Sequence, residues 1–368
     1  MRAYHEIIHH QQATMIELGW HVSHLIVALI LTALVALVVR LQDGRQHDKQ
    51  QRSTNRKVAE ALTPTRTDRS PTANPIETPA PFDSLAVSYD KSFCETTVGC
   101  MLRRETWKVL EEAFASSSES QSSSDGDNNN TIIELSCGTG EDAMWLAAKH
   151  VHVLATDYSD GMIDVARSKC RSCSAIAKED QPIFRRLDAK KFDASSLDMG
   201  PNGHRLFAGA FSNFGGLNNV SPEEIEHCAQ TMFQVLMPGA KVVLVVMGRF
   251  CLMETIYWLV RGNFTKAFRR MRSSSTQGIA VTVAKKKHTV YFHSMDTVEA
   301  AFSNTRKFRR VKRRAIGLLV PPSLWSRSAS RRVPLKALSI LYSVDMLLGQ
   351  LWPFIYMGDH YLIEFERL

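Results

Sequence analysis

The stretch Thr131-Ile-Ile-Glu-Leu-Ser-Cys-Gly-Thr-Gly-Glu-Asp-Ala-Met-Trp-Leu-Ala147 decides which fold the sequence predicts. It begins as a short apolar strand, continues into a glycine turn and ends in the first turns of an amphipathic helix. Gly138 and Gly140 allow the backbone to turn sharply and to approach a ligand closely, and the free amides at the following helix start favour a polar or anionic group. The stretch therefore predicts a cradle for a nucleotide-type cofactor.

Strands and helices alternate on the C-terminal side of this stretch. Ser221 followed by Pro222 is typical of a helix N-cap and first helical position, and residues 241–247 are almost entirely apolar, as in a strand buried on both faces. Strands separated by helices imply right-handed crossovers and a doubly wound, mostly parallel α/β sheet. The expected strands are residues 132–135, 152–155, 183–187, 206–211 and 241–247; the expected helices are residues 142–149, 162–170 and 222–236, the last closed by a turn at 237–239.

Acidic residues stand at the ends of the first three expected strands. These are Glu134, Asp157 and Asp188, and in a doubly wound sheet they would line one crevice beyond the carboxyl ends of the strands. Asp157 lies 17 residues after Gly140, which suits an acceptor for ribose hydroxyls in a βαβ unit. The turn has no third glycine at dinucleotide spacing, and Glu134 would repel a pyrophosphate but would receive an ammonium group. These two features decide against NAD.

Five motifs then follow one another along the chain. They are Glu-Leu-Ser-Cys-Gly-Thr-Gly at 134–140, Ala-Thr-Asp-Tyr-Ser at 155–159, Leu-Asp-Ala at 187–189, Phe-Ser-Asn-Phe-Gly-Gly-Leu-Asn at 211–218 and Leu-Met-Pro-Gly-Ala at 236–240. As a set they resemble the class I S-adenosylmethionine-dependent methyltransferases, and most closely the broad group that includes the quinone-biosynthesis methyltransferases. The resemblance covers residues 82–248 and, weakly, the last strand. It implies a Rossmann-like, mostly parallel seven-stranded sheet with S-adenosylmethionine as cofactor.

The resemblance also implies roles for individual residues. It places the methionine part of the cofactor at Glu134, Gly138 and Gly140, the ribose hydroxyls at Asp157 and the adenine amino group at Asp188. Asn213 and Phe214 would border adenine and the methyl-transfer site. The expected cofactor-binding set is completed by their neighbours Ser136, Cys137, Tyr158 and Ala189. The family commonly has glycine where Ser136 stands, so a tighter turn and an altered cofactor affinity are expected here.

Methyl transfer relies mostly on positioning the acceptor in line with the methyl group, so a strong acid or base signature need not be present. Asn213 is one candidate for the catalytic site, and His293 or His360 is the candidate where a base is needed. Structural roles compete: Asp188 as a helix cap, Asn213 and Asn218 as turn residues, Tyr89 as a packed aromatic and His360 as a surface histidine. No metal site is expected, because the seven cysteines are scattered and Cys170-Arg-Ser-Cys173 is a lone CxxC.

The N-terminal part predicts a membrane anchor. After a tail at residues 1–17, residues 18–39 form a run of 22 residues without Asp, Glu, Lys or Arg, long enough to span a bilayer. A cleaved signal peptide is the alternative, but the preceding region has little positive charge and no small-residue cleavage pattern follows. Basic residues that follow the run predict a single-pass protein whose catalytic domain is cytoplasmic. Residues 40–81 are expected to be a disordered linker.

Residues 82–368 are expected to form the methyltransferase domain. It would comprise cap helices at 82–115, an exposed polar loop at 116–130, a cofactor-binding core at 131–248 and a basic, apolar substrate-side region at 249–368. The whole chain carries a net charge of +8, yet residues 261–336 alone hold 19 Lys or Arg against Asp296 and Glu299. In this region we expect apolar helical segments at 250–260 and 335–357 and strands at 289–293, 310–319 and 361–365.

The basic and apolar region favours an anionic surface as partner, either membrane or nucleic acid, although it is equally compatible with a solvated basic face. Together with the anchor, it favours a small lipophilic acceptor, such as a quinone precursor or a lipid, over a soluble metabolite. An RNA-directed methyltransferase is less favoured, because no RNA-binding module and no Asn-Pro-Pro-aromatic motif is present. A catalytically silent S-adenosylmethionine-binding membrane protein is the non-enzyme alternative. The sequence does not indicate an oligomeric state.

Overall fold

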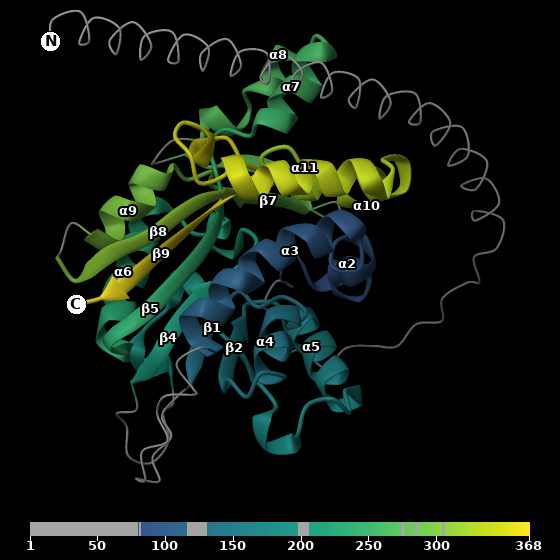
Figure 1. Cartoon of the computed structure of the whole chain (residues 1–368). Coiled ribbons are helices and arrows are strands. Elements are labelled where there is room, and N and C mark those ends of the chain that lie inside the picture. The colour runs from purple at the N-terminus through teal and green to yellow at the C-terminus, as the bar shows by residue number, and fades with distance from the viewer. Residues whose placement is uncertain are drawn as a thin grey trace, which may run out of the picture.

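A seven-stranded β-sheet forms the centre of the computed structural model (Figure 1), which describes residues 80, 82–115, 131–197, 206–273, 277–283, 286–303 and 306–368. The strand order is β3-β2-β1-β4-β5-β9-β8, in which the first five strands are parallel and β9 is antiparallel to both neighbours. The predicted mostly parallel sheet of seven strands is therefore confirmed. Its strands are β1 (Ile132–Leu135), β2 (Val153–Asp157), β3 (Ile183–Arg186), β4 (Phe207–Ser212), β5 (Leu236–Met247), β8 (Phe308–Ile316) and β9 (His360–Arg367).

Helices cover both faces of this sheet. One hydrophobic core holds side chains of α3 (Thr97–Leu110), α4 (Glu141–Ala147) and α5 (Asp160–Ser172), and the other holds side chains of α6 (Pro222–Val235) and α9 (Met295–Ser303). Within β5, Val243 and Val245 belong to the first core, whereas Val242 and Leu244 belong to the second. This alternation is the two-residue period of a strand that is buried on both faces.

The strand order reverses between β1 and β4, which places a crevice at their carboxyl ends. Two of the helices that start at this edge, α5 and α6, are fixed by side-chain caps. Ser221 and Glu224 form a reciprocal capping box at the start of α6, with Pro222 at its first position, as the sequence predicted. At the start of α5, the hydroxyl of Ser159 accepts a hydrogen bond from the Met162 amide. These caps orient the loops that border the crevice.

The predicted turn at residues 237–239 is wrong in one respect. Strand β5 begins at Leu236, which pairs with Phe207, and the next regular pair joins Gly209 to Lys241. The residues between them bulge out of the ladder, and Gly239 has a φ of 79°, which glycine adopts without strain. Proline and glycine therefore mark a bulge inside the strand here.

The C-terminal region also departs from prediction. The apolar segment at 335–357 is one helix only as far as α11 (Leu335–Leu348); Pro353 has no amide hydrogen to continue a helix. Of the predicted strand at 289–293, only residues 289 and 290 belong to a strand. They end β7 (Lys286–Val290), which pairs with β6 (Ile279–Val283) in a separate antiparallel hairpin, and β6 was not predicted. The remaining helices of the described residues are α2 (Ala86–Ser92), α7 (Leu252–Val260), α8 (Phe264–Ala267) and α10 (Ser326–Arg332), together with short 3₁₀ turns and a π-helical turn at Glu111–Ala115.

The predicted anchor at residues 18–39 lies outside the described residues, as do the tail at 1–17, the loop at 116–130 and almost all of the linker at 40–81. Within the part of the chain that the structure describes, no helix is long and apolar enough to cross a membrane.

Candidate functional site

A cavity of about 1020 Å³ lies at the carboxyl ends of β1, β2 and β4. Its walls come from the glycine turn, the ends of β2 and β4, the N-terminal helices, the β6–β7 hairpin and the first residue of β9. This volume is at the upper end of the range for ligand pockets, so it has room for a cofactor together with a second molecule.

The glycine turn takes left-handed backbone conformations at three positions. The φ angle is 63° at Ser136, 55° at Gly138 and 79° at Gly140. At Gly138 a Cβ atom would meet nothing within 4 Å, so this residue opens towards the cavity that it lines. At Gly140 a Cβ atom would lie 2.7 Å from Phe184 Cε1, so this glycine instead allows close packing behind the turn. Ser136 and Cys137 line the cavity; Gly140 does not.

Asp157 holds the glycine turn against the end of β2. One carboxylate oxygen accepts a hydrogen bond from the Gly138 amide and the other from the Ser159 amide, each at 2.8 Å. Asp157 and Tyr158 both line the cavity, and burial raises the pKa of Asp157. The carboxylate keeps further lone pairs for donors in the cavity, such as a pair of ribose hydroxyls.

Glu134 lies behind the turn rather than on the cavity wall. It is fully buried in β1, its Oε2 atom has no hydrogen-bond partner, and it is not among the residues that line the cavity. Burial, with a contribution from the nearby Asp142 carboxylate, raises the pKa of Glu134 well above its usual range. An ammonium group brought close to this acid would stabilise its charged form.

Asp188 and Ala189 line the cavity beyond the end of β3, together with Lys190. The Asp188 carboxylate accepts a hydrogen bond from the Lys190 amide at 3.0 Å and so caps the short 3₁₀ turn Ala189–Lys191. Asp188 therefore both caps the turn and lines the cavity, so it remains a candidate for binding the cofactor.

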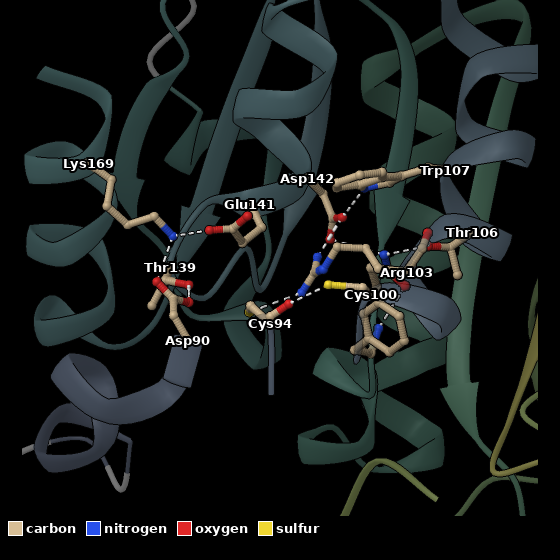
Figure 2. Close-up of polar contacts among 12 residues, drawn as sticks. Asp90, Cys94, Cys100, Arg103, Thr106, Trp107, Thr139, Glu141, Asp142 and Lys169 are labelled. Carbon is tan, nitrogen blue, oxygen red and sulfur yellow. Dashed lines mark hydrogen bonds and ion pairs between the residues drawn. The ribbon is translucent and has the colours of Figure 1, made fainter. Parts of the chain in front are cut away.

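Figure 2 shows a buried polar network that joins α3 to α4 beside the turn. The Asp142 carboxylate lies 2.6 Å from the Arg103 guanidinium and accepts a hydrogen bond from the Trp107 indole at 2.6 Å. The Asn213 amide donates to Asp142 at 3.0 Å and to the Thr106 hydroxyl at 3.1 Å. Asn213 therefore positions α3 and α4 relative to β4. Arg103 and Asp142 both line the cavity, and neither was predicted from the sequence.

A second network in Figure 2 fastens α2 to the glycine turn. Asp90 accepts a hydrogen bond from the Thr139 hydroxyl at 2.5 Å and pairs with Lys169 at 2.7 Å, and Lys169 also pairs with Glu141. Burial disfavours the Asp90 charge, but Lys169 and Thr139 more than offset it, so the pKa of Asp90 is lowered. The network holds the N-terminal helices over the cavity.

Aromatic side chains crowd around Phe214 on the far side of the turn. Phe214 has a φ of 45°, which is an outlier for a bulky residue, and its ring lies 5.0 Å from Phe93 and 5.5 Å from His360 between ring centroids. The Arg103 guanidinium lies 5.0 Å from the Phe214 ring centroid. Tyr89 lines the same part of the cavity, and burial raises its pKa. A strained residue held among cavity-lining groups is typical of a functional site.

The two candidate histidines lie in different places. His360 lines the cavity, and its Nδ1 atom lies 3.2 Å from Asp359 Oδ2. Burial disfavours the Asp359 charge, but His360 and Arg270 hold the pKa of Asp359 well below its usual range. His293 is not among the lining residues; its Nε2 atom lies 3.0 Å from the Val220 carbonyl oxygen, and burial lowers its pKa. Of these two predicted histidines, His360 lies at the cavity and His293 does not.

The β6–β7 hairpin supplies an apolar wall that the sequence reasoning missed. Ile279, Val281, Val283 and Val290 line the cavity. His288 fixes the hairpin, because its Nε2 atom lies 2.6 Å from Asn219 Oδ1 and its ring packs edge to face on Phe82. The part of the cavity wall that the hairpin forms is thus mostly apolar. No group of three His, Cys, Asp or Glu side chains within the described residues could hold a metal ion.

Comparison with known proteins relates the residues around the cavity to a protein family. Residues 132–239, which contain the glycine turn and the strands around the cavity, match a family model described as a methyltransferase domain. This part of the chain is a class I methyltransferase domain.

A curated relative of this methyltransferase domain is the demethylmenaquinone methyltransferase of Clavibacter sepedonicus. It is 27% identical over 172 residues, which are 46% of this chain and 58% of the relative. The chain thus spans little more than half the length of the relative it matches.

Solved structures of similar fold have low sequence identity to this chain. A magnesium protoporphyrin IX methyltransferase from Synechocystis PCC 6803, with bound S-adenosylhomocysteine, is 12% identical with a TM-score of 0.45, covering 78% of this chain and 96% of that one. An S-adenosylmethionine-dependent methyltransferase from Methanosarcina mazei is 16% identical with a TM-score of 0.40, covering 65% and 92%. These TM-scores are too low to bear on function, and the strand order of the chain itself establishes the fold.

The residues of the methyltransferase domain fit S-adenosylmethionine as cofactor. The open side of Gly138 leaves space for a ligand backbone, and Asp157 has acceptor capacity towards the cavity. The unpartnered Glu134 oxygen lies behind the turn and not on the cavity wall. Asp188 and Ala189 line the cavity wall beyond the end of β3.

Proposed function

We propose that the protein transfers a methyl group from S-adenosylmethionine to a small lipophilic acceptor. The observation that carries the proposal is the contact between Asp157 and the Gly138 amide at the cavity wall. It joins the ribose acceptor to the glycine turn at the point where the strand order reverses, which is where this fold binds its ligand.

The cofactor, when bound, supplies a methyl group carried on a sulfonium. Glu134 and the glycine turn would hold the amino-acid end, Asp157 the ribose hydroxyls, and Asp188 the adenine amino group. Phe214, Tyr89 and His360 would then surround the reacting methyl group and its acceptor. Their fixed positions favour in-line attack, because alignment of the reacting atoms supplies much of the rate in such a transfer.

His360 is the side chain best placed to accept a proton from the acceptor. The imidazole would take the proton that the acceptor atom releases as the methyl group bonds to it. Asp359 beside the ring would stabilise the imidazolium that results.

The apolar hairpin wall supports a lipophilic acceptor. Valine and isoleucine side chains offer an acceptor ring or chain a surface without hydrogen-bond demands. The similarity to a demethylmenaquinone methyltransferase is consistent with a quinone precursor, and a lipid is the other acceptor of this class. Residues 18–39 would tether the domain to a membrane, with the catalytic domain on the cytoplasmic side.

Two measurements test this proposal. Labelled S-adenosylmethionine should bind the purified full chain, and Asp157→Ala should weaken that binding. The label should then pass into the lipid fraction when the protein is given a membrane extract. Transfer into soluble metabolites alone would reject the lipophilic acceptor, and transfer into RNA would identify an RNA-directed enzyme. Binding without any transfer would indicate a catalytically silent protein.

A further inference from the structure

Exposed apolar side chains gather on two segments of the C-terminal region. Of the 15 large hydrophobic residues that are exposed in the described chain, ten lie between 260 and 271 or between 335 and 356. Of these ten, the most exposed are Trp352 at 79% and Leu347 at 72%. We call these ten residues the α7–α11 surface: Val260, Phe264, Phe268, Met271, Leu335, Ile340, Leu347, Leu351, Trp352 and Tyr356.

The two segments adjoin each other in the fold. Leu252 and Ile256 of α7 pack on the same small hydrophobic cluster as Leu341 and Leu348 of α11. The Leu252 amide also donates a hydrogen bond to the Met357 carbonyl at 2.9 Å. Figure 1 shows α7, α8 and α11 on one side of the molecule, at the end of the sheet from which β9 starts. The two segments that carry the exposed apolar residues therefore adjoin each other through α7 and α11.

Only two residues of α11 are buried, Leu338 and Asp345. They lie seven positions apart and so face the core together. The opposite side of the helix presents Ile340 and Leu347, which are 65% and 72% exposed. Single exposed leucines are common on protein surfaces, whereas several exposed apolar side chains on one helix face mark an interaction site.

Positive charge surrounds this face without exposed negative charge. Six exposed Lys and Arg side chains of residues 260–272 and 327–336 have no carboxylate partner among the described residues: Arg261, Lys266, Arg272, Arg327, Arg331 and Lys336. The acidic residues within 249–273 and 323–358 are Glu254 and Asp345, and both are buried. The surface therefore offers solvent only apolar, neutral polar and cationic groups.

Two of these cations lie directly over aromatic rings at the edge of the apolar residues. The Lys266 ammonium is 4.5 Å from the Trp258 ring centroid, and the Arg261 guanidinium is 4.5 Å from that of Tyr257. Lysine and arginine beside apolar and aromatic side chains suit the boundary between a hydrocarbon layer and its headgroups.

We propose that the α7–α11 surface docks on an anionic phospholipid bilayer. A bilayer offers both an apolar layer for Leu347 and Trp352 and anionic headgroups for the surrounding cations. This contact is a property of the folded domain, distinct from the anchor predicted at residues 18–39. Arg269 and Ser323, which border the surface segments, also line the cavity, so docking brings the cavity next to the lipid.

The test locates the lipid contact directly in the full chain. The purified protein is mixed, without S-adenosylmethionine, with vesicles of phosphatidylcholine and phosphatidylserine that carry a photoactivatable acyl chain, and labelled peptides are identified by mass spectrometry. Peptides that contain residues 260–272 and 335–357 should carry the label, and the label should fall when phosphatidylserine is omitted. Label absent from both segments, with label elsewhere, would overturn the proposal whatever the methyl-transfer assays show.

Variants distinguish specific binding by the α7–α11 surface from non-specific adsorption of the protein to vesicles. Leu347→Asp with Trp352→Asp should remove most of the label from residues 335–357, and Lys266→Glu with Lys336→Glu should weaken labelling about tenfold. Ile183→Asp and Lys178→Glu, also at exposed positions, are the matched controls and should leave labelling unchanged. If the Leu347 and Trp352 changes instead convert a dimer to a monomer in light scattering and leave labelling intact, a second copy covers the surface and the lipid proposal fails.

Discussion

The Asp142 carboxylate on α4 lies 2.6 Å from the Arg103 guanidinium on α3, and both side chains are almost fully buried. Asp142 also accepts hydrogen bonds from Trp107 and Asn213. Its carboxylate therefore links α3, α4 and the end of β4. Removal of one charge from such a pair leaves the other without compensation in a medium of low dielectric constant.

Asp142→Asn should therefore lower the free energy of unfolding by about 3–5 kcal/mol, measured by urea denaturation. The double variant with Arg103→Met should recover part of this loss, because no unpaired charge remains. Lys312→Met, which breaks the exposed pair with Glu112, is the control and should change stability by less than about 1 kcal/mol. Equal effects of the buried and exposed changes would contradict the role of the network.

Ser136 and Gly216 constrain each other. Ser136 has a φ of 63°, and a Cβ atom added at Gly216 would overlap the Ser136 side chain. Ser136→Gly should raise the free energy of unfolding by up to about 1 kcal/mol, because relief of strain exceeds the added chain entropy. Gly216→Ala should cost about 1–3 kcal/mol in the original chain and less when residue 136 is glycine. Gly248→Ala, whose Cβ would meet nothing closer than 3.4 Å, should be tolerated. Strict additivity of the two changes would contradict the contact.

Substitution of His360 and of His293 should have different effects, because we propose His360 as the proton acceptor and His293 as a structural residue. His360→Asn should lower the rate of methyl transfer by about 10²–10⁴-fold for an acceptor that must lose a proton, while S-adenosylmethionine binding persists. His293→Asn should reduce thermal stability, because its ring contacts the Val220 carbonyl, and should retain transfer in the folded fraction. The reverse pattern, with transfer lost only on substitution of His293, would move the base away from the cavity.

Stability should fall as the pH rises through the neutral range, because of two buried acids, Glu105 on α3 and Asp345 on α11. Burial and the neighbouring Asp345 raise the pKa of Glu105 to about 8, and burial raises the pKa of Asp345 to about 7. A raised folded-state pKa means that the folded chain binds these protons more tightly than the unfolded chain. Their stabilising contribution is therefore full below about pH 4 and is lost as the pH rises towards about 8.

Glu105→Gln should flatten this decline, measured as the free energy of unfolding between pH 5 and pH 8 at roughly one-unit steps. Ser343→Ala, on the exposed side of α11, changes neither acid and should keep the original slope. An unchanged slope in the Gln variant would show that Glu105 does not take up a proton on folding.

The order and type of the core elements could be predicted because local signals agree there. Apolar strands, the glycine turn and the Ser221 cap each indicate the observed structure. Strand β6 was missed because the residues between β6 and β7 are Ala284 and Lys285, without the glycine, asparagine or aspartate that mark a tight hairpin. The bulge at Gly239 was taken for a turn because both use the same residue types.

The site was only partly predictable for a different reason. Asp157, Asp188 and the glycine turn belong to adjacent strands, so their proximity follows from topology alone. Arg103 and Asp142 come from helices far apart in sequence, and an acid in the first turn of a helix ordinarily indicates only a favourable interaction with the helix dipole. Likewise, only the packing of β9 shows that His360 faces the cavity, and only the contact with the Val220 carbonyl shows that His293 does not.

Strand β9 lies between β5 and β8, although residues 248–359 separate it from β5 along the chain. During synthesis on the ribosome, the edge of β5 that pairs with β9 therefore stays open until residues 360–367 leave the exit tunnel. An open apolar edge of this kind is a template for pairing with another nascent chain. The protein should thus depend on chaperones late in translation, after its cofactor cradle has already been made.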